Sequence, residues 1–294
     1  MNILIIGSAG QVGGALADVL RRNKNFKVTA ADKTISKSGV FLDITNGKQA
    51  FQLIDKIKPS VIILSAAITN VDFCEDHQKI AHKINVKGVE NIVEAAKKDL
   101  SKLIYISTAY VFNGRKGNYK ENDKPCPINY YAQTKLEAEG IVQKELNDYL
   151  IIRTNWVFDS GYDQRNFIVR LLGALKNKEL VKAPNDQYGN PTLARNIAWA
   201  VEELIQKNKK GIYHIVGRDK MSKYQWALKT AKYFNLDPKL VIPVSTNNLK
   251  QRAKRPKKDD LNIQKVQKEL KIKMFSLNKS LNFFKAQDRK IYKK

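Results

Sequence analysis

Short runs of apolar residues recur through the first half of the chain, separated by stretches with helical spacing. A run of this length, apolar on both faces, fits a strand buried between two layers of helices, as in parallel sheets. The alternation of strands and helices predicts an α/β fold, a Rossmann-type doubly wound parallel sheet. The predicted strands are ILII at 3–6, FKVTA at 26–30, VIIL at 61–64, LIYI at 103–106 and LII at 150–152.

The pattern loosens after about residue 155. Helices are predicted at 166–176, 193–206 and 223–234, with a short strand at 211–216. We therefore divide the chain into an NAD(P)-binding Rossmann domain, 1–155, and a smaller mixed α/β lobe, 156–294, that is mainly substrate-binding and ends in a basic tail. This lobe is expected to cap the carboxyl edge of the sheet, where open α/β sheets bind ligands.

The formal net charge of +25 raises the question of nucleic-acid binding. Residues 247–294 carry 16 Lys and Arg residues against four Asp and Glu residues, about half of the excess. The chain has no zinc finger and no basic platform interleaved with aromatic residues, so a lysine-rich solvated surface explains the charge better than a nucleic-acid partner. Small acidic ligands such as nucleotides remain compatible with it.

Membrane, secretion and metal signals are missing from the sequence. No run of about 18 apolar residues occurs and the N-terminus lacks the layout of a secretory signal, so we expect a cytoplasmic protein without a membrane partner. Cys74 and Cys126 have no metal-like spacing and are expected to be free thiols. His77 and His82 do not share a helical face and His214 stands alone, so no protein-bound metal is expected.

The segment ILIIGSAGQVGGALADVL places Gly7, Gly10 and Gly13 between a strand and a helix. Glycines at these positions allow a tight turn and a close approach of the backbone, so the helix N-terminus can hold a pyrophosphate. The context of strand, glycines and helix predicts a dinucleotide cofactor.

Two acids follow the glycine segment. Asp32 lies about twenty residues after the glycines, where a carboxylate can accept hydrogen bonds from the adenosine ribose. Asp32 favours NAD, whereas Lys33 beside it can tolerate a ribose phosphate, so the choice between NADH and NADPH stays open. Asp43 in FLDIT, with Ile44 beside it, is predicted to reach the cofactor; an exposed turn aspartate explains Asp43 almost equally well.

The stretch NYYAQTKLE at 129–137 places Lys135 four residues after Tyr131, on the same face of a predicted helix. Tyr130 has only Thr134 at that spacing. A tyrosine must lower its pKa by about three units to exchange protons near neutrality, and a nearby ammonium together with an oxidised nicotinamide supplies about that stabilisation. We therefore predict Tyr131 as the catalytic acid or base, with a surface Tyr–Lys pair as the alternative.

A predicted strand in KLIYISTAYVF ends at Ser107 and Thr108. Hydroxyls at the carboxyl edge of the sheet can bind a substrate carbonyl and share the proton path with Tyr131. A hydroxyl that satisfies its own backbone is the alternative.

At these motifs the sequence resembles the extended short-chain dehydrogenase/reductases, and within them the dTDP-4-dehydrorhamnose reductase family, over about residues 1–270. The last four motifs, in register, are more specific than the glycine loop. The resembling segments are GSAGQVG, AAITNVDFCE, STAYVFNG, NYYAQTK, RTNWVF, NDQYGNPT and RPKKDDLN.

This resemblance implies reduction of the 4-keto group of a nucleotide-linked deoxysugar by NADH or NADPH, with dTDP-4-dehydrorhamnose reduced to dTDP-rhamnose as the family's reaction. It implies that Tyr131 is the proton donor, that Lys135 lowers the pKa of Tyr131 and holds the nicotinamide ribose, and that Thr108 orients the keto oxygen.

The resemblance also implies further binding residues. Trp156 is expected to pack on the sugar and Arg255 to lie near the diphosphate, with Tyr110 and Asn166 also on the substrate side. The further cofactor-binding residues that it implies are Gln11, Val12, Ala66 and Ala67.

Two positions depart from the family pattern. Ala109 stands where the usual motif STDYVF has a carboxylate, which removes a group that contacts the sugar or the proton network. Ala15 stands where some bacterial members have a glutamate that shares a metal at a dimer interface. A metal-bridged dimer is therefore not expected, and a homodimer of another kind is left open.

Two other functions share the same superfamily signals. A nucleotide-sugar epimerase, which recycles its bound cofactor, fits the loop with Ala109 as well as a reductase does. A non-catalytic subunit similar to the regulatory subunit of methionine adenosyltransferase also binds a dinucleotide, although Thr108, Tyr131 and Lys135 argue against it.

Overall fold

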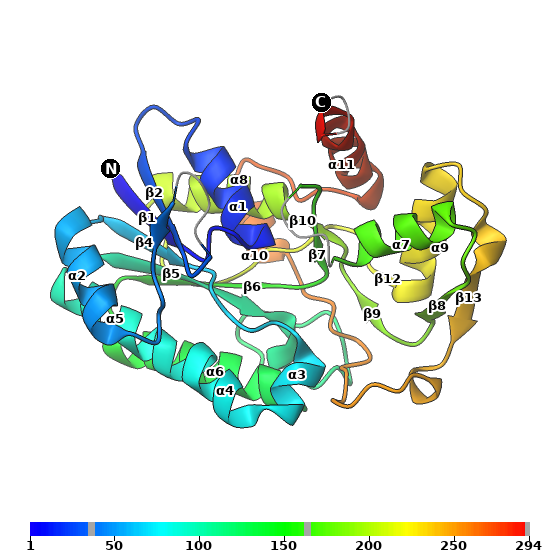
Figure 1. Ribbon diagram of the computed structural model, residues 1–294, viewed down its shortest axis with the longest axis horizontal. Helices are drawn as coiled ribbons and strands as arrows, with labels where there is room; N and C mark the ends of the chain where they lie inside the picture. Colours follow the sequence, from blue (N-terminus) through cyan, green and yellow to red (C-terminus); the bar gives the residue numbers. More distant parts are fainter. Residues whose placement is uncertain (35–38, 162–165, 292–294) are drawn as a thin grey trace.

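The predicted apolar runs form neighbouring strands of one seven-stranded parallel sheet in the computed structural model, which describes residues 1–34, 39–161 and 166–291 (Figure 1). The order β11-β6-β5-β4-β1-β2-β3 is that of a Rossmann sheet, which confirms the predicted fold class. Along the chain the strands are β1 (Asn2–Ile6), β2 (Lys27–Asp32), β3 (Val40–Phe41), β4 (Val61–Leu64), β5 (Lys102–Thr108), β6 (Tyr149–Thr154) and β11 (Gly211–His214).

Helices cover both faces of this sheet because alternate strand residues point to opposite sides. Ile3 and Ile5 pack with α1 (Gln11–Leu20) and α8 (Ala194–Gln206). Leu4 and Ile6 pack on the other face, which is covered by α2 (Gly47–Ile57), α5 (Gly88–Lys98) and α6 (Tyr130–Glu145), seen to the left of the sheet and below it in Figure 1. Full burial of each such side chain contributes roughly 1.5–3 kcal/mol to the free energy of unfolding.

Short helical segments connect these layers. α3 (Val71–Asp76) and α4 (Gln78–His82) lead into a π-helical turn at Lys83–Lys87 that continues directly into α5.

No helix in the described ranges is long and apolar enough to cross a membrane.

A smaller lobe follows β6 and lies beyond the carboxyl edge of the sheet (Figure 1). Its core joins Phe158 and Trp226 to the apolar faces of α7 (Phe167–Lys176), α9 (Lys223–Tyr233) and α11 (Leu277–Ile291). Three small strand pairs connect its loops: β7 (Val157–Phe158) with β10 (Thr192–Leu193), β8 (Val181–Pro184) with β13 (Val241–Val244), and β9 (Tyr188–Gly189) with β12 (Met221–Ser222).

The strand predicted at 211–216 lies in the main sheet rather than in the smaller lobe. β11 pairs in parallel with β6, and α8, just before it, packs against α1. Segments beyond residue 155 therefore complete one edge and one helix layer of the Rossmann unit. The pairing partner of so short a strand is set by tertiary packing, which its own sequence does not encode.

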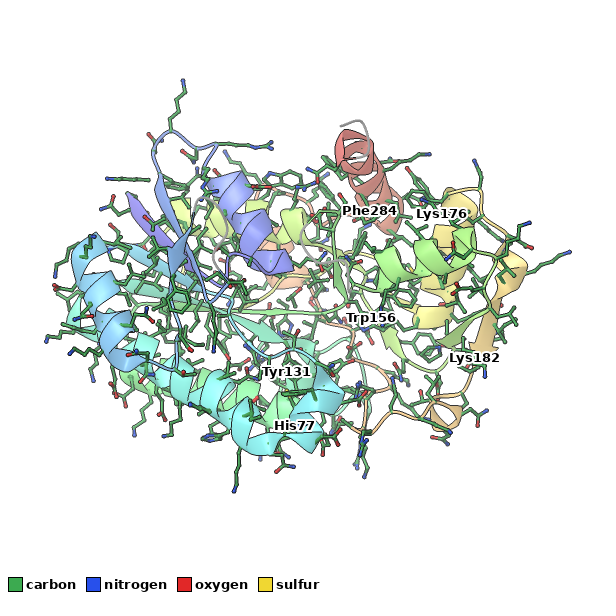
Figure 2. The ribbon with its side chains drawn as sticks, viewed as in Figure 1. His77, Tyr131, Trp156, Lys176, Lys182 and Phe284 are labelled. Atoms are coloured by element: carbon green, nitrogen blue, oxygen red, sulfur yellow. The ribbon has the colours of Figure 1, made fainter. Side chains whose placement is uncertain are left out.

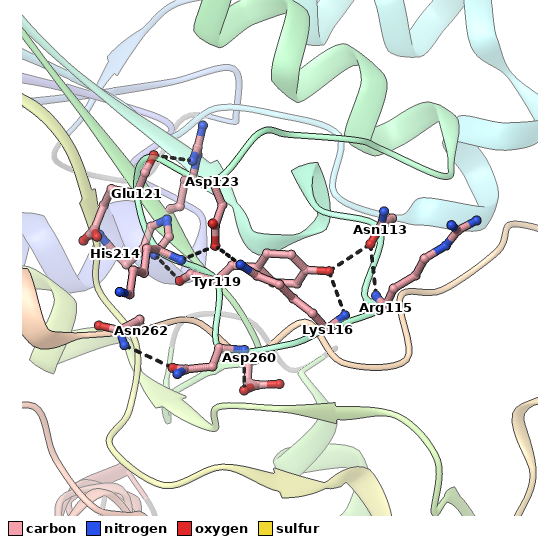
Figure 3. Close-up of polar contacts among 12 residues, drawn as sticks. Asn113, Arg115, Lys116, Tyr119, Glu121, Asp123, His214, Asp260 and Asn262 are labelled. Carbon is pink, nitrogen blue, oxygen red and sulfur yellow. Dashed lines mark hydrogen bonds and ion pairs between the residues drawn. The ribbon is translucent and has the colours of Figure 1, made fainter.

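The C-terminal segment returns to the loop that follows β5 (Figure 3). The carboxylate of Asp260 accepts a hydrogen bond from the Asn118 amide at 2.8 Å, and its carbonyl accepts one from the Tyr119 amide at 3.1 Å. His214 Nδ1 donates to the Tyr119 carbonyl, at 3.0 Å. Burial lowers the pKa of His214 to about 3, so its imidazole is neutral. These contacts hold the C-terminal segment around Asp260 against the loop after β5. Helix α10 (Gln264–Glu269) follows this segment.

The turn from β1 into α1 leaves no space for side chains at two of its glycines. Gly7 has φ +92°, and a Cβ on it would lie 2.4 Å from the Ala66 amide nitrogen. A Cβ on Gly13 would lie 2.1 Å from the Gly7 carbonyl oxygen. The first turn of α1 therefore sits directly against the ends of β1 and β4, as a pyrophosphate-binding turn requires.

We predict that Gly13→Ala lowers the free energy of unfolding by about 1–3 kcal/mol, because the added methyl group overpacks this contact. Gly140→Ala in α6 is the matched control, since nothing lies within 4 Å of the position of its Cβ. That control should raise the free energy of unfolding by about 0.5–1 kcal/mol through helix propensity. Urea unfolding of both variants measures the difference, and equal effects would contradict the close approach.

Candidate active site

A cavity of about 420 Å³ opens where the carboxyl ends of β1, β4 and β5 meet the smaller lobe. Tyr131 and Trp156 lie on its two sides, one from the sheet domain and one from the lobe (Figure 2). Its lining brings together most of the predicted site residues: Gly7, Gly10, Gln11, Val12, Gly13, Ala67, Thr108, Tyr110, Tyr131, Lys135 and Trp156.

The glycine end of the cavity fits a dinucleotide. The backbone at the start of α1 lines the cavity at Gly10 and Gly13. The side-chain amide of Gln11 donates to the Asp159 carbonyl at 3.0 Å, which links α1 to the smaller lobe. Backbone amides and the positive end of a helix dipole attract a pyrophosphate at such a turn.

The two acids predicted to bind the cofactor, Asp32 and Asp43, do not line the cavity. The carboxylate of Asp32 accepts hydrogen bonds from the amides of Ala9, at 2.9 Å, and Thr34, at 2.8 Å, so it orders the glycine turn. Lys33 forms an ion pair with Asp43 at 2.8 Å, and the hydrogen bond from Lys33 lowers the pKa of Asp43 to about 2.

Two other predicted cofactor residues form packing contacts instead of lining the cavity. Ile44 is buried, and a Cβ on Gly88 would lie 2.7 Å from its side chain. Ala66 presents its backbone to Gly7, as described above.

Tyr131 and Lys135 lie in the first two turns of α6, which begins after Asn129. The Asn129 side chain caps the helix by accepting the Ala132 amide, at 2.9 Å. Tyr131 is 8% exposed and Lys135 3% exposed. The Lys135 ammonium donates to the Ile106 carbonyl at 2.8 Å and lies 4.1 Å from the centre of the Tyr105 ring.

The sequence predicts that Lys135 and an oxidised nicotinamide together lower the Tyr131 pKa, and the protein alone does not lower it. Burial raises the pKa of Tyr131 above its ordinary value, and only a hydrogen bond with Thr108 lowers it. Burial also lowers the pKa of Lys135 to about 7, against the opposing charge of Glu139. Desolvation disfavours the charged form of each group and is the largest cause of both shifts. Without ligands, the phenol is therefore held protonated.

Thr108 and Tyr110 complete the wall around the phenol. The Thr108 hydroxyl accepts the Tyr110 amide at 3.2 Å, which fixes the turn after β5. The Tyr110 ring meets the Tyr131 ring edge-on, with centroids 6.3 Å apart. Ala109 between them is fully buried in a cluster with Val111 and Phe112, and it does not line the cavity.

A buried ionic network beneath the site escaped the sequence reasoning. Ser107, which lines the cavity, donates to the carboxylate of Glu139, and Arg153 binds the same carboxylate through two nitrogens at 2.6 and 3.0 Å. Glu139 follows Lys135 by one helical turn, and this spacing is the signal that points to it. The network fixes α6 to the ends of β5 and β6.

Asn85, in the π-helical turn, is a second residue that the sequence reasoning missed. Its side-chain carbonyl accepts the Ile68 amide at 2.8 Å, and its amide group donates to the Ile68 carbonyl and to the Thr134 hydroxyl. It thereby joins the loop after β4 to α6, at the residue before Lys135. π-Helical turns are frequent at functional sites for such local reorientation.

The predicted substrate residues separate into two groups. Trp156 has φ +42°, an uncommon backbone state for a bulky residue, and its ring stacks on Trp226 with centroids 5.6 Å apart. Asn166 caps α7 and Arg255 forms an ion pair with Asp72 at 3.0 Å; neither lines the cavity.

Thr69, Asn155 and Lys223 line the cavity and were not predicted.

Comparisons with known proteins identify the family. The family model for the RmlD substrate binding domain matches residues 1–288. The chain belongs to the dTDP-4-dehydrorhamnose reductase family. It is 34% identical to the dTDP-4-dehydrorhamnose reductase of Aggregatibacter actinomycetemcomitans, over 97% of this chain and 98% of that protein, and 33% identical to the one from Escherichia coli K12, over 91% of each.

Solved structures agree with this family. The dTDP-4-dehydrorhamnose reductase of Bacillus anthracis, in complex with NADP, has a TM-score of 0.90 and 32% identity, covering 97% of this chain and 99% of its own. A hypothetical dTDP-4-dehydrorhamnose reductase from Sulfolobus tokodaii has a TM-score of 0.85 and 37% identity, covering 94% and 97%. The predicted family and the predicted reductase class are confirmed, and the predicted cofactor agrees with the NADP of the Bacillus anthracis structure.

Metal ligands do not converge in the part of the chain that the structure describes, where no group of three His, Cys, Asp or Glu side chains is placed to hold a metal ion. Ala15, the position of a glutamate in some family members, is fully buried in α1.

We predict that Lys135 makes the ligand-free protein more stable as the pH rises from 7.5 to 9.5. Its folded pKa of about 7 is below that of an unfolded lysine, so the unfolded chain binds more protons in this window and the free energy of unfolding rises with pH. The free energy of unfolding of wild type minus that of Lys135→Met should therefore rise by about 1 kcal/mol per pH unit. In Lys144→Met, which removes a side chain that is 83% exposed, the difference should stay constant. A constant difference for Lys135→Met in urea titrations would refute a neutral buried amine.

Proposed function

We propose that this chain reduces the 4-keto group of dTDP-4-dehydrorhamnose to give dTDP-rhamnose, using NADPH or NADH. The observation that carries the proposal is one cavity that joins a glycine turn suited to a pyrophosphate to the side chains of Thr108, Tyr131 and Lys135. The names of the relatives support this substrate, and the cofactor preference is left to the assay below.

The start of α1 would hold the pyrophosphate of the dinucleotide in this proposal. Asp32, at the end of β2, would bind the adenosine ribose, and Lys135, in the cavity wall, would hold the nicotinamide ribose. When bound, the reduced nicotinamide supplies the hydride for the keto carbon.

Tyr131 supplies the proton in this proposal. Because burial raises its pKa, the phenol is fully protonated at neutral pH, which is the form that a reduction needs. The Thr108 hydroxyl, which lines the same cavity as the phenol, would orient the keto oxygen. As hydride addition places negative charge on that oxygen, the phenol proton moves to it. The resulting phenolate is stabilised by Thr108 and by the ammonium form of Lys135.

We predict that Tyr131→Phe reduces kcat for dTDP-4-dehydrorhamnose by about 10²–10⁴-fold, the usual contribution of a general acid. The affinity for NADPH should change by less than a few-fold, because the ring stays in place. Tyr130→Phe is the control, since Tyr130 precedes it in the same helix and does not line the cavity. Retained turnover in Tyr131→Phe, followed as loss of NADPH absorbance, would overturn the assignment.

The same assay separates a reductase from an epimerase. A reductase consumes one equivalent of reduced cofactor per sugar, with NADPH and NADH each tested against a small panel of 4-keto nucleotide sugars. Turnover without net oxidation of the cofactor would indicate an epimerase instead.

A further inference from the structure

Lys223 is the lysine that the smaller lobe contributes to the cavity wall. It is the first residue of α9, and Ser222 before it caps the helix in a capping box with Gln225. The Lys223 amide donates to the Gln187 carbonyl at 3.0 Å. The backbone that carries this side chain is therefore fixed by the helix start and by the β9–β12 pair.

The ammonium of Lys223 lies among aromatic rings. Its nitrogen is 3.8 Å from the centre of the Trp156 ring, 4.6 Å from that of Trp226 and 5.0 Å from that of Phe167. Within the described part of the chain, no hydrogen bond or ion pair of this ammonium is formed. An ammonium carries three donors, and aromatic faces attract its charge without accepting those hydrogen bonds. The side chain thus has donor capacity to offer a ligand.

Asp259 is the buried acid that interacts with Lys223. It is 1% exposed, and neither of its carboxylate oxygens has a hydrogen-bond partner among the described residues. Its amide donates to the Tyr188 carbonyl, and its own carbonyl accepts the Asn155 amide group, each at 2.9 Å. No ion pair within 4 Å joins it to Lys223 in the described chain. Burial raises the pKa of Asp259 and lowers that of Lys223, and the charge of each group opposes the shift of the other.

We propose that Lys223 donates a hydrogen bond to a hydroxyl oxygen of the hexose of a nucleotide sugar, and that Asp259 is a positioning residue that holds the Lys223 ammonium for this contact. The inference rests on the proposed function, because it assumes a nucleotide-sugar substrate in this cavity. It adds a recognition residue on the side of the cavity opposite Tyr131.

A neutral hydroxyl fits this end of the cavity better than a phosphate. Burial raises the pKa of Asp259 and lowers that of Lys223, so the pair has no net charge whether both groups are charged or both are neutral, and a phosphate would gain little net attraction. A hydroxyl can accept a hydrogen bond from the ammonium while the apolar face of the hexose packs on the neighbouring aromatic side chains. Lys223 would then discriminate among sugars rather than among nucleotides.

The test compares ligands with and without the hexose. Calorimetry should show that Lys223→Met weakens dTDP-rhamnose binding by about 10–100-fold, the loss expected for a hydrogen bond from a charged donor. Binding of dTDP, which lacks the hexose, should change by less than two-fold. Equal weakening of both ligands would place the contact on the diphosphate, and no weakening of either would show a purely structural lysine; each outcome overturns the proposal.

Lys220→Met is the matched control. Lys220 lies three residues earlier, is 47% exposed, forms an ion pair with Asp260 and does not line the cavity. Its loss should leave the affinity for both ligands within two-fold. NADP⁺ binding, which uses the opposite end of the cavity, reports whether each variant is folded.

A double-mutant cycle tests the positioning role of Asp259. Asp259→Asn alone should reduce the ratio of dTDP-rhamnose to dTDP affinity, and in the Lys223→Met background it should cause no further reduction. Additive losses would contradict action through Lys223.

If Lys223→Met does not fold, wild-type protein is tested with 2-deoxy and 3-deoxy analogues of dTDP-rhamnose. One analogue should bind about 10–100-fold more weakly, and unchanged binding of both overturns the proposal.

Assays of the wild-type protein distinguish failure of this inference from failure of the proposed function. Turnover of dTDP-4-dehydrorhamnose together with an unchanged Lys223→Met variant rejects this inference alone. Failure of the wild type to bind or reduce any nucleotide sugar rejects the proposed function, and this inference with it.

Discussion

The hydrogen bond from the Lys135 ammonium to the Ile106 carbonyl fixes the catalytic helix α6 to strand β5 of the sheet. Strand β5 is buried along its whole length, so its carboxyl end has one position relative to α6. Tyr131, one helical turn before Lys135, is thereby held at the mouth of the cavity beside Thr108. The ionic network of Ser107, Glu139 and Arg153 secures the next turn of the same helix. The sheet core thus determines where the proton donor stands.

Burial has opposite consequences for the two partners, and both suit a reduction. A desolvated phenol keeps its proton, whereas a desolvated amine loses some of its preference for the charged form. Before reaction, the phenol is the stable acid of the pair. Once negative charge appears at the substrate oxygen, the same low-dielectric surroundings strengthen the attraction of that charge to the Lys135 ammonium. Transition-state charge therefore gains more from Lys135 than ground-state charge does.

The sheet could be predicted because its strands are short, continuous apolar runs, and VIIL at 61–64 coincides with β4. The two-residue strands of the smaller lobe could not, because their pairing depends on tertiary contacts. β11 was recognised as a strand, but its partner was not. In the site, the glycines and the Tyr131–Lys135 pair have fixed local spacing and do meet in the cavity. Asn166 and Arg255 came only from resemblance, and the structure uses them for a helix cap and an ion pair.

Lys223 shows most clearly which site residues the sequence cannot predict. Among 53 Lys and Arg residues, no local pattern distinguishes one lysine that turns inward from those on the surface. Only the packing of Trp156, Trp226 and Phe167 around its amine reveals it. The sequence does not predict the burial of Asp259 either, because that burial results from pairing with β9, about 70 residues earlier in the chain.

The most direct test of the central claim is a crystal structure of the protein with NADP⁺ and dTDP-rhamnose. Our account predicts that the Tyr131 hydroxyl and the Thr108 hydroxyl both lie about 2.6–3.2 Å from the oxygen on C4 of the hexose. A hexose bound with its C4 oxygen directed away from both hydroxyls, beyond the reach of one bridging water, would contradict it.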